Sequence, residues 1–186
     1  MQRGLRISSR LGVLAACLLL GLPVSFSAAA PSVPSAPIDS VFHIEKSANH
    51  NQVHYGVQVD PECRPVGARP VYAYWRNLEQ GPRAMSAILR HEQPAYGLTE
   101  PRSVRRGAGG GEIRIGLRGF PDRLLTIRTF REANLCRART FTTIANQPAV
   151  LRTIYVELGF LFSVDYVVVR GFRVMDGAAV QEKVDD

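Results

Sequence analysis

The sequence predicts an all-β protein, an antiparallel barrel-like or sandwich domain of about nine strands with one short helix. Two observations carry this prediction. Apolar and polar residues alternate with a period of two in short runs along most of the chain after residue 37, which is typical of half-buried strands. Turn-forming residues separate the runs at regular spacing, as in sandwiches and barrels.

The first two strands flank the segment SANHN at residues 47–51. The runs VFHIE (41–45) and QVHYGVQVD (52–60) both alternate apolar with polar residues. The segment between them is rich in residues that tolerate left-handed backbone or hydrogen-bond their own main chain. We therefore expect a β-hairpin with Phe42 and Ile44 on its buried face.

The run VYAYW (71–75) is apolar on both faces, which predicts a central strand buried on two sides or a lined barrel wall. Met85, Ile88 and Leu89 follow at helical spacing, so the short helix is expected over 83–91. A Gly-rich tip, RRGAGGGE (105–112), comes next. The remaining strands are EIRIGL (112–117), LLTIRTF (124–130), RARTFTTI (137–144), RTIYVEL (152–158), VDYVVVRGF (164–172) and VQEKV (180–184).

The N-terminus predicts a secretory signal peptide over residues 1–29. Arginines precede an apolar run at 11–22, and the small residues SFSAAA follow, which is the order of a cleaved leader. The apolar run is too short for a membrane span, so no transmembrane span is expected in the mature chain. Residues 30–37 form a Pro-rich linker, and residues 38–186 form a single β-rich domain. The protein is expected in the periplasm or outside the cell.

The cysteines bear on both localisation and stability. Leu14 to Cys17 spells a bacterial lipoprotein box, but the apolar run continues past the cysteine, so lipidation through Cys17 is the less favoured prediction. Cleavage of the leader leaves Cys63 and Cys136, an even number in an oxidising compartment, which favours one disulfide bond. Two unpaired buried thiols are the alternative.

Charge narrows the classes of partner. The leader holds three of the 23 Lys and Arg residues, so the mature chain keeps 20 against 16 Asp and Glu, a net charge of +4. This mild excess excludes a nucleic-acid partner and leaves weak contact with anionic surfaces. Arginines on the outward phase of several strands predict either a basic contact face or an ordinary solvated surface: Arg114, Arg118, Arg128, Arg137, Arg139 and Arg152.

Three pieces of the sequence carry a family resemblance: FHIEKSANHNQVHY, PVYAYWRNLEQG, and IYVEL…VDYVVVRGF…VQEKV. In this order they resemble the bacterial family called domain of unknown function 4833. The resemblance implies export and a compact β-rich domain, and it implies no activity. The Gly-rich tip and the Pro-rich loop around Cys63 depart from the family pattern.

The hairpin brings histidines and an acid together. His43, Glu45, His50 and His54 could converge if the first two strands pair, but their spacing matches no zinc motif. No metal site is therefore predicted. The sequence also lacks a nucleophile elbow, a fixed carboxylate pair and a phosphate loop. We expect no cofactor and assign no catalytic residue.

Aromatic residues offer the best candidate for binding. Tyrosines and a tryptophan on the 71–75 strand could line a pocket for an apolar or sugar ligand. Core packing is the simpler interpretation, because large aromatics dominate protein cores. Together with polar residues of the hairpin, the candidate binding residues are Glu45, Asn49, Asn51, Tyr72, Tyr74, Trp75 and Tyr96.

These observations predict an exported, non-enzymatic β-domain that binds a ligand or a partner in the cell envelope. The alternative is a periplasmic hydrolase, whose acids or histidines would converge near the 43–54 hairpin. The chemical identity of the ligand is not predicted.

Overall fold

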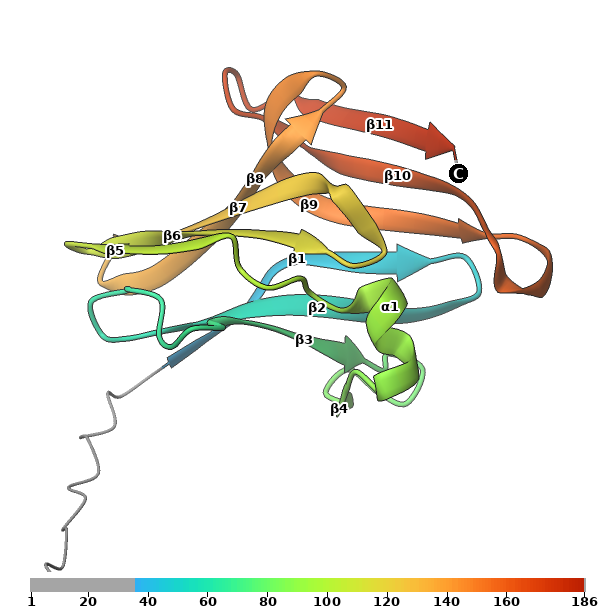
Figure 1. Ribbon diagram of the computed structural model, residues 1–186, viewed down its shortest axis with the longest axis horizontal. Helices are drawn as coiled ribbons and strands as arrows, with labels where there is room; N and C mark the ends of the chain where they lie inside the picture. The colour runs from blue at the N-terminus through green and yellow to red at the C-terminus, as the bar shows by residue number, and fades with distance from the viewer. Residues whose placement is uncertain (1–35, 186) are drawn as a thin grey trace, which may run out of the picture. The chain divides into compact units, whose positions relative to one another are not determined.

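The computed structural model describes residues 36–185, so the predicted leader, Cys17 and residues 30–35 of the predicted linker lie outside the described residues. Eleven strands dominate it, with one α-helix and two 3₁₀ helices (Figure 1). The elements are β1 (Ala36–Lys46), β2 (Asn49–Val59), β3 (Val71–Arg76), β4 (Met85–Ala87), η1 (Arg90–Glu92), α1 (Gln93–Tyr96), β5 (Ser103–Gly107), β6 (Gly110–Leu117), β7 (Phe120–Glu132), β8 (Leu135–Ile144), β9 (Gln147–Leu158), η2 (Phe160–Phe162), β10 (Val164–Arg173) and β11 (Ala179–Asp185).

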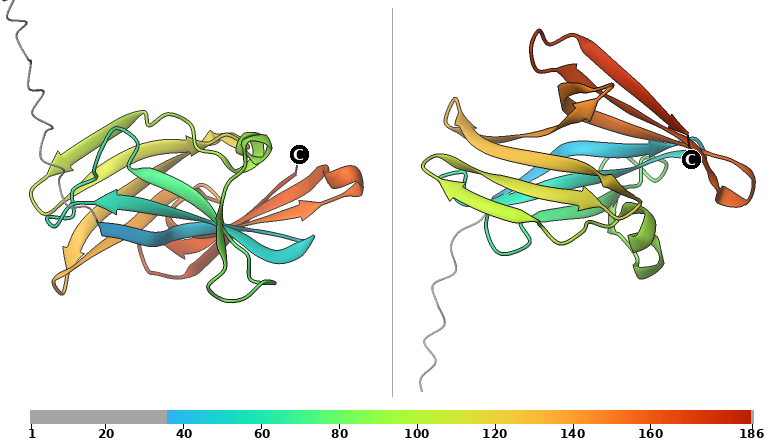
Figure 2. Two further views of the ribbon diagram at one scale, coloured as in Figure 1. Left: turned by 90° about the horizontal axis from the view of Figure 1, so that it is seen from below. Right: turned by 45° about the horizontal axis from the view of Figure 1, so that its top comes forward.

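The strands form one sheet in the order β4-β3-β2-β1-β9-β8-β7-β6-β5, and β10 and β11 branch from β9. The first part of β9 pairs with β8, and its residues 153–156 pair in parallel with β1. The sheet therefore folds over at β9, so that β5 to β8 face β1 to β3 as two layers (Figure 2). It does not close into a barrel, and the predicted all-β, sandwich-like class is confirmed.

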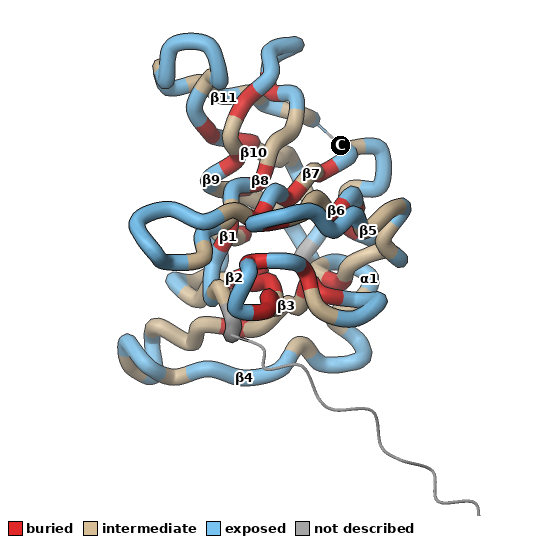
Figure 3. Tube along the Cα trace, turned by 90° about the vertical axis from the view of Figure 1, so that its left-hand side faces the viewer, coloured by how far each residue is buried: buried red, intermediate tan, exposed pale blue. Residues whose placement is uncertain are grey.

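The core lies between the two layers. The inward phase of β2, from Val53 to Val59, is fully buried, and Ile113 and Ile127 cover it from the opposite layer. Figure 3 shows buried residues concentrated along the facing strands, whereas the turns are mostly exposed. Each buried aliphatic side chain contributes about 1.5–3 kcal/mol to the hydrophobic stabilisation of the fold.

The predicted hairpin is confirmed. Lys46 pairs with Asn49 and His43 pairs with His54, so Ser47 and Ala48 make the turn. Phe42 and Ile44 are buried, with exposed fractions of 2% and 5%. The turn is shorter than the segment 47–51, because Asn49 and the residues after it already pair with β1.

The helix predicted over 83–91 is wrong in position. Residues 85–87 instead form β4, which pairs with the free edge of β3. Met85 and Leu89 are 65% and 56% exposed. Their helical spacing therefore does not mark the buried face of a helix. The helix begins only at Gln93, where Pro94 in the first turn is compatible with helical backbone.

The prediction that 71–75 forms a central strand is also wrong. The β3 strand lies between β2 and the three-residue β4, near one edge of the sheet. Tyr72 and Tyr74 face away from the core. Tyr72 covers Gly56, where a Cβ would lie 2.3 Å from the tyrosine ring, so the apolar second face of β3 covers its neighbouring strand.

The count of about nine strands falls short by two. The short β4 carries no periodic pattern, and β5 consists of SVRRG, in which polar residues follow one another. In β5, pairing with β6 through the tight turn at Ala108 and Gly109 outweighs the weak propensity of the segment. The Gly-rich tip is thus an ordered hairpin.

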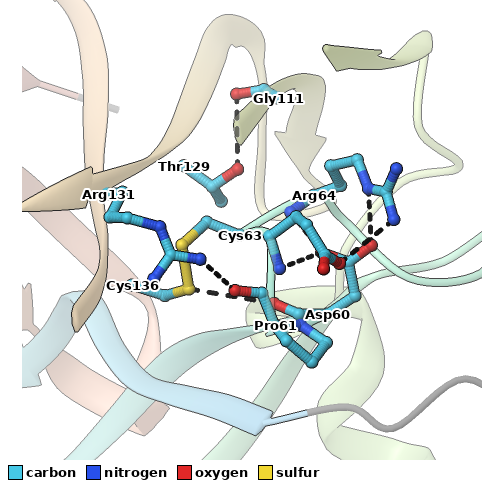
Figure 4. The surroundings of a disulfide bond; sticks show 9 residues. Asp60, Pro61, Cys63, Arg64, Gly111, Thr129, Arg131 and Cys136 are labelled. Carbon is cyan, nitrogen blue, oxygen red and sulfur yellow. Dashed lines mark hydrogen bonds and ion pairs between the residues drawn. A yellow bond between two sulfur atoms is a disulfide. The ribbon is translucent and has the colours of Figure 1, made fainter. Parts of the chain in front are cut away.

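The predicted disulfide is confirmed. Cys63 and Cys136 are bonded, and their Cα atoms lie 5.2 Å apart (Figure 4). Cys63 has a positive φ of 64° within the loop that joins β2 to β3. The bond ties this loop to the beginning of β8, in the opposite layer of the sheet.

Asp60 organises the same loop. Its carboxylate accepts hydrogen bonds from the backbone N–H groups of Glu62 and Arg64, at 3.0 and 2.8 Å, and from Arg64 Nε at 2.6 Å. Burial of the carboxyl works to raise the pKa of Asp60, but the hydrogen bonds and charge of Arg64 outweigh it and lower the pKa. The loop is therefore held by an ion pair as well as by a covalent bond.

Candidate functional site

A large cavity lies at the end of the sheet that carries α1, opposite the disulfide, and we name it the Trp75 cavity. Its volume is about 890 Å³. It lies between the strands of β1, β3 and β9 to β11 on one side and α1 with the β6–β7 turn on the other. Its lining residues are Ile44, Lys46, Ala48, Asn49, Trp75, His91, Glu92, Ala95, Tyr96, Leu117, Gly119, Phe120, Ile154, Val156, Leu158, Val164, Val167, Val184 and Asp185.

Strand register builds the apolar floor of the cavity. Ile44 of β1 pairs with Ile154 of β9, and Val156 of β9 pairs with Val167 of β10. Side chains opposite one another in adjacent strands point to the same face of a sheet. The rows of branched side chains that fill the core elsewhere therefore continue to this end, where the second layer no longer covers them fully.

Trp75 is fixed at the wall of the cavity. Its Nε1 donates a hydrogen bond to Glu92 Oε2 at 2.9 Å, and the backbone N–H of Leu89 donates to the same oxygen at 2.8 Å. The ring of Tyr96 packs edge-on against the indole, with 5.2 Å between centroids. Trp75 is only 7% exposed, so the ring serves both the core and the cavity wall.

Lys46 places a cation at the same wall. It follows Phe42 and Ile44 on the inward phase of β1, where an apolar residue is the norm. Its Nζ lies 4.5 Å from the centroid of the Trp75 ring, a cation–π distance. Among the ion pairs found within residues 36–185, none involves Lys46. The interaction described for its ammonium group is therefore the one with the Trp75 ring.

Tyr96 contributes a neutral phenol to the cavity. Burial raises the pKa of Tyr96, and the nearby charge of Glu92 raises it further. Its backbone carbonyl accepts a hydrogen bond of 2.7 Å from the hydroxyl of Tyr55, which is fully buried in the core. This bond anchors α1 to β2 and fixes the position of the Tyr96 ring against Trp75.

The structure separates the predicted binding residues into three places. Trp75, Tyr96 and Asn49 line the Trp75 cavity. Tyr72 and Tyr74 lie on the opposite face of the sheet, where the hydroxyl of Tyr74 donates to the backbone carbonyl of Asp39 at 2.8 Å. The aromatic strand therefore divides its rings between the two faces.

Glu45 and Asn51 line the third place, a surface depression of about 540 Å³ beside the β1–β2 turn. Asn49 lines this depression as well as the Trp75 cavity. Asn51 Nδ2 donates to Glu79 Oε2 at 3.4 Å. Glu79 lies in the segment that follows β3, and by accepting this hydrogen bond it stabilises the turn.

The histidines of the hairpin form a hydrogen-bonded row on the outer face. His43 Nε2 lies 2.9 Å from Glu45 Oε1, and Gln52 Nε2 donates to the same oxygen at 3.3 Å. His54 Nε2 lies 2.9 Å from Gln52 Oε1, and its Nδ1 lies 2.8 Å from Ser40 Oγ. Within residues 36–185 there is no group of three or more His, Cys, Asp or Glu residues placed to hold a metal ion.

Several forces keep His54 neutral. Burial lowers its pKa to about 4, and the charges of His43 and Arg76 act in the same direction. Its ring stacks on that of His43, with 4.9 Å between centroids and 11° between planes. A neutral imidazole whose two nitrogens both have partners stabilises the hairpin.

Four of the six outward arginines share one face. Arg114, Arg128, Arg137 and Arg139 lie on the outer side of β6 to β8, where they form ion pairs with glutamates of the same sheet. The remaining two, Arg118 and Arg152, lie elsewhere, in the β6–β7 turn and on β9.

Sequence reasoning missed most of this site. Lys46, Glu92 and Phe120 were not candidates, nor were the valines of β9 to β11. One signal was available: Lys46 continues the inward phase of VFHIE, and a lysine in that phase is unusual. The approach of α1 and the β6–β7 turn carries no local signal, because it depends on how the sheet folds over.

The helices of the described residues include none long and apolar enough to cross a membrane. Comparison with known proteins gives no match among curated proteins and none among solved structures. The family model described as "Domain of unknown function (DUF4833)" matches residues 42–183. This match begins within β1, ends within β11 and covers more than half of the chain, which therefore belongs to the DUF4833 family.

Proposed function

We propose that this protein is an exported, non-enzymatic binding domain that holds an amphipathic anion in the Trp75 cavity. The ligand has an apolar body, such as an acyl chain, and a negatively charged head. The observation that carries the proposal is the Lys46 ammonium at an inward position of a cavity otherwise lined mainly by apolar side chains.

The size and lining of the cavity support a small-molecule ligand. Ligand pockets usually measure about 300–1,000 Å³ and combine apolar walls with a few polar groups. The Trp75 cavity has about 890 Å³. Its floor of Ile44, Ile154 and Val156 offers branched side chains to a hydrocarbon, and burying a hydrocarbon is favourable by about 0.8 kcal/mol per CH₂ group.

The charges of the wall support an anionic head. Both carboxylates of the wall already have partners: Glu92 accepts hydrogen bonds from Trp75 and Leu89, and Asp185 pairs with Lys183 at 2.9 Å. The ammonium group of Lys46, by contrast, contacts only a π face among the interactions described for residues 36–185. A ligand carboxylate or phosphate near Lys46 would form a charge-assisted hydrogen bond, which is about twice as strong as a neutral one.

The chain carries its own reporter for this proposal. Trp75 is the single tryptophan of the sequence, and its emission overlaps the absorption of cis-parinaric acid, a fluorescent fatty acid. We expect saturable energy transfer from Trp75 to the probe with one site per chain. Parinaryl alcohol, which lacks the charge, is expected to bind at least five-fold more weakly.

A matched pair of variants tests the location. Val167 lines the cavity, and its neighbour Val168 lies on the opposite face of β10. We expect Val167→Phe to fill the cavity and to abolish probe binding, and Val168→Phe to leave binding unchanged. Equal binding by both folded variants, or no saturable binding by the unmodified protein, would overturn the proposal.

Export is supported by the order of charged, apolar and small residues in 1–29 and by the disulfide, which persists in oxidising compartments. N-terminal sequencing of the protein from a periplasmic or extracellular fraction is expected to show cleavage before residue 31. An intact Met1 in the cytoplasm would contradict export. A chain that begins with a lipid-modified Cys17 would show a lipoprotein in place of a chain cleaved after Ser27 or Ala29.

A hydrolase near the 43–54 hairpin is the second candidate. Ser40 Oγ lies 2.8 Å from His54 Nδ1, and Gln52 Oε1 lies 2.9 Å from the other ring nitrogen, an order of groups that resembles nucleophile, base and orienting residue. We favour the binding domain because the lowered pKa makes His54 a weak base and because neither Ser40 nor His54 lines the cavities described. Labelling of Ser40 by a fluorophosphonate, lost in Ser40→Ala, would reverse this preference.

A further inference from the structure

The β9–β10 turn exposes two large apolar side chains to solvent. Phe160 and Leu161 are 86% and 80% exposed, although most large apolar residues of the described chain are buried or partly buried. The segment LGFLFSV from 158 to 164 contains no charged residue. Figures 1 and 2 show this turn projecting at the same end of the sheet as α1. We call residues 159–163 the apolar tip.

The backbone holds the apolar tip in this form. Leu161 has a φ of 54°, in the left-handed region that costs a residue with a branched side chain about 1–2 kcal/mol. Hydrogen bonds within the tip hold the strained turn: Gly159 N–H donates to the Ser163 carbonyl at 2.9 Å, and Ser163 Oγ donates to the Phe160 carbonyl at 2.9 Å. The exposure of Phe160 and Leu161 is thus built into the turn.

The same hydrogen bonds reduce the cost of removing the tip from water. Unpaired backbone groups cost several kcal/mol each in a hydrocarbon environment. In the apolar tip the N–H groups of Gly159 and Ser163 donate to carbonyls of the tip itself, and the hydroxyl of Ser163 does the same. Below the tip, Leu158 N–H donates to Ser47 Oγ at 2.9 Å. A segment with these properties suits an apolar medium.

The apolar tip adjoins the mouth of the Trp75 cavity. Leu158 and Val164 precede and follow it, pair with each other across the strands, and both line the cavity. The apolar surface therefore continues from the tip into the cavity wall. Glu157 and Asp165 stand on either side of the segment, and their charges disfavour an anionic surface.

We propose that the apolar tip inserts into the headgroup region of a lipid bilayer with neutral headgroups and so holds the cavity mouth at the membrane. Phe and Leu side chains in the boundary region of a bilayer anchor peripheral proteins by burying apolar area. This interaction goes beyond the proposed function, since Phe160 and Leu161 lie outside the cavity and need no ligand to act.

Co-sedimentation of the mature, disulfide-bonded protein with phosphatidylcholine vesicles tests the proposal. We expect the bound fraction to fall at least five-fold in Phe160→Ser/Leu161→Ser and to change little with salt. Met175→Ser is the matched control, because Met175 is 88% exposed but lies at the other end of β10. It is expected to bind as the unmodified protein does.

A second measurement reports the depth of the tip. In Phe160→Trp, vesicles that contain brominated phosphatidylcholine are expected to quench the new tryptophan more strongly than Trp75 is quenched in the unmodified protein. Val167→Phe separates the two proposals: it is expected to lose parinaric acid and to keep vesicle binding. Equal vesicle binding with and without the two tip substitutions would overturn the proposal. A dimer lost in that variant, with no vesicle binding by either, would identify a second copy of the chain as the partner instead.

Discussion

The two ends of the sheet are built in opposite ways. At one end, the loop 60–70 is tied to the other layer by the Cys63–Cys136 bond, and the backbone carbonyl of Pro61 accepts a hydrogen bond from Arg131 Nη2 (Figure 4). Arg106 Nε donates to the Pro65 carbonyl at 2.7 Å. At the other end, the Trp75 cavity is covered by η1, the four-residue helix α1 and short turns.

The difference shows how an unclosed sheet can hold a cavity. The two layers separate at the cavity end. The apolar side chains there line a ligand-sized space and do not pack against the opposite layer. Covalent and ionic contacts at the disulfide end hold the layers together without help from that space. The proposed binding site and the disulfide that stabilises the fold thus lie at different ends of the sheet, and substitutions can test this division.

Removing the disulfide is expected to have the largest effect on stability. The bond joins residues 73 apart in sequence, and a closed loop of this length stabilises the fold by about 4 kcal/mol in the chain-entropy model. Urea unfolding of Cys63→Ala/Cys136→Ala checks this figure. Parinaric acid binding by the folded fraction should stay unchanged. A loss of binding with an intact fold would break the division between the two ends.

Trp75→Ala is expected to cost about 3 kcal/mol of unfolding free energy. Truncating a buried aromatic usually costs about 3–5 kcal/mol, and the indole is placed at the low end of this range because it borders a cavity. Trp75→Phe keeps a ring and is expected to lose less than half as much. Near-normal stability of the alanine variant by urea unfolding would show that Trp75 belongs to the binding surface alone.

Asp60→Ala is expected to cost about 2 kcal/mol, because it removes the acceptor of two part-buried backbone N–H groups and of the Arg64 side chain. Asp60→Asn tests the pH dependence. The folded pKa of Asp60 is lowered, so its carboxylate stabilises the fold above the unfolded pKa of about 3.9. That stability is lost as the pH falls through the folded pKa. Unfolding free energies measured between pH 5 and 2 should fall more steeply for the unmodified protein than for Asp60→Asn.

Lys46→Met is expected to change stability least. The substitution keeps an apolar stem over Trp75 and removes the cation, so the unfolding free energy should change by less than about 0.5 kcal/mol. The affinity for parinaric acid is expected to fall about ten-fold, equivalent to about 1.4 kcal/mol. Binding of the uncharged alcohol should not change. A drop in the affinity for both probes would mean that Lys46 shapes the cavity and does not contact the anionic head.

The sequence predicted the parts of the fold that depend on local pattern. Period-two alternation located β1, β2 and most later strands, and the even number of cysteines left after the predicted leader indicated the disulfide. The prediction of a helix at 83–91 failed because the free edge of β3 offers residues 85–87 hydrogen bonds that spacing cannot reveal. The β5 strand was missed for a similar reason, since its pairing with β6 overrides its composition.

The candidate site was harder to predict than the fold. Trp75, Tyr96 and Asn49 were candidates that line the cavity, but nothing in VYAYW tells which rings face inward once the strand is apolar on both sides. The cavity also needs residues from β1 and β9, whose parallel pairing joins distant parts of the chain. Tertiary pairings of this kind leave no periodic trace in either segment.

The pairing of β9 with β1 has a consequence for how the chain acquires its structure. Residues 43–46 meet residues 153–156, so the contact that joins the two layers closes a loop of about 110 residues, nearly three quarters of the described chain. Such non-local pairing slows folding to about milliseconds or seconds, because loop-closure entropy is lost before the contact is gained. Until β9 has been synthesised, β1 lacks the strand that joins it to the opposite layer. A chain emerging from the ribosome therefore stays incompletely folded until residues 153–156 can pair with β1.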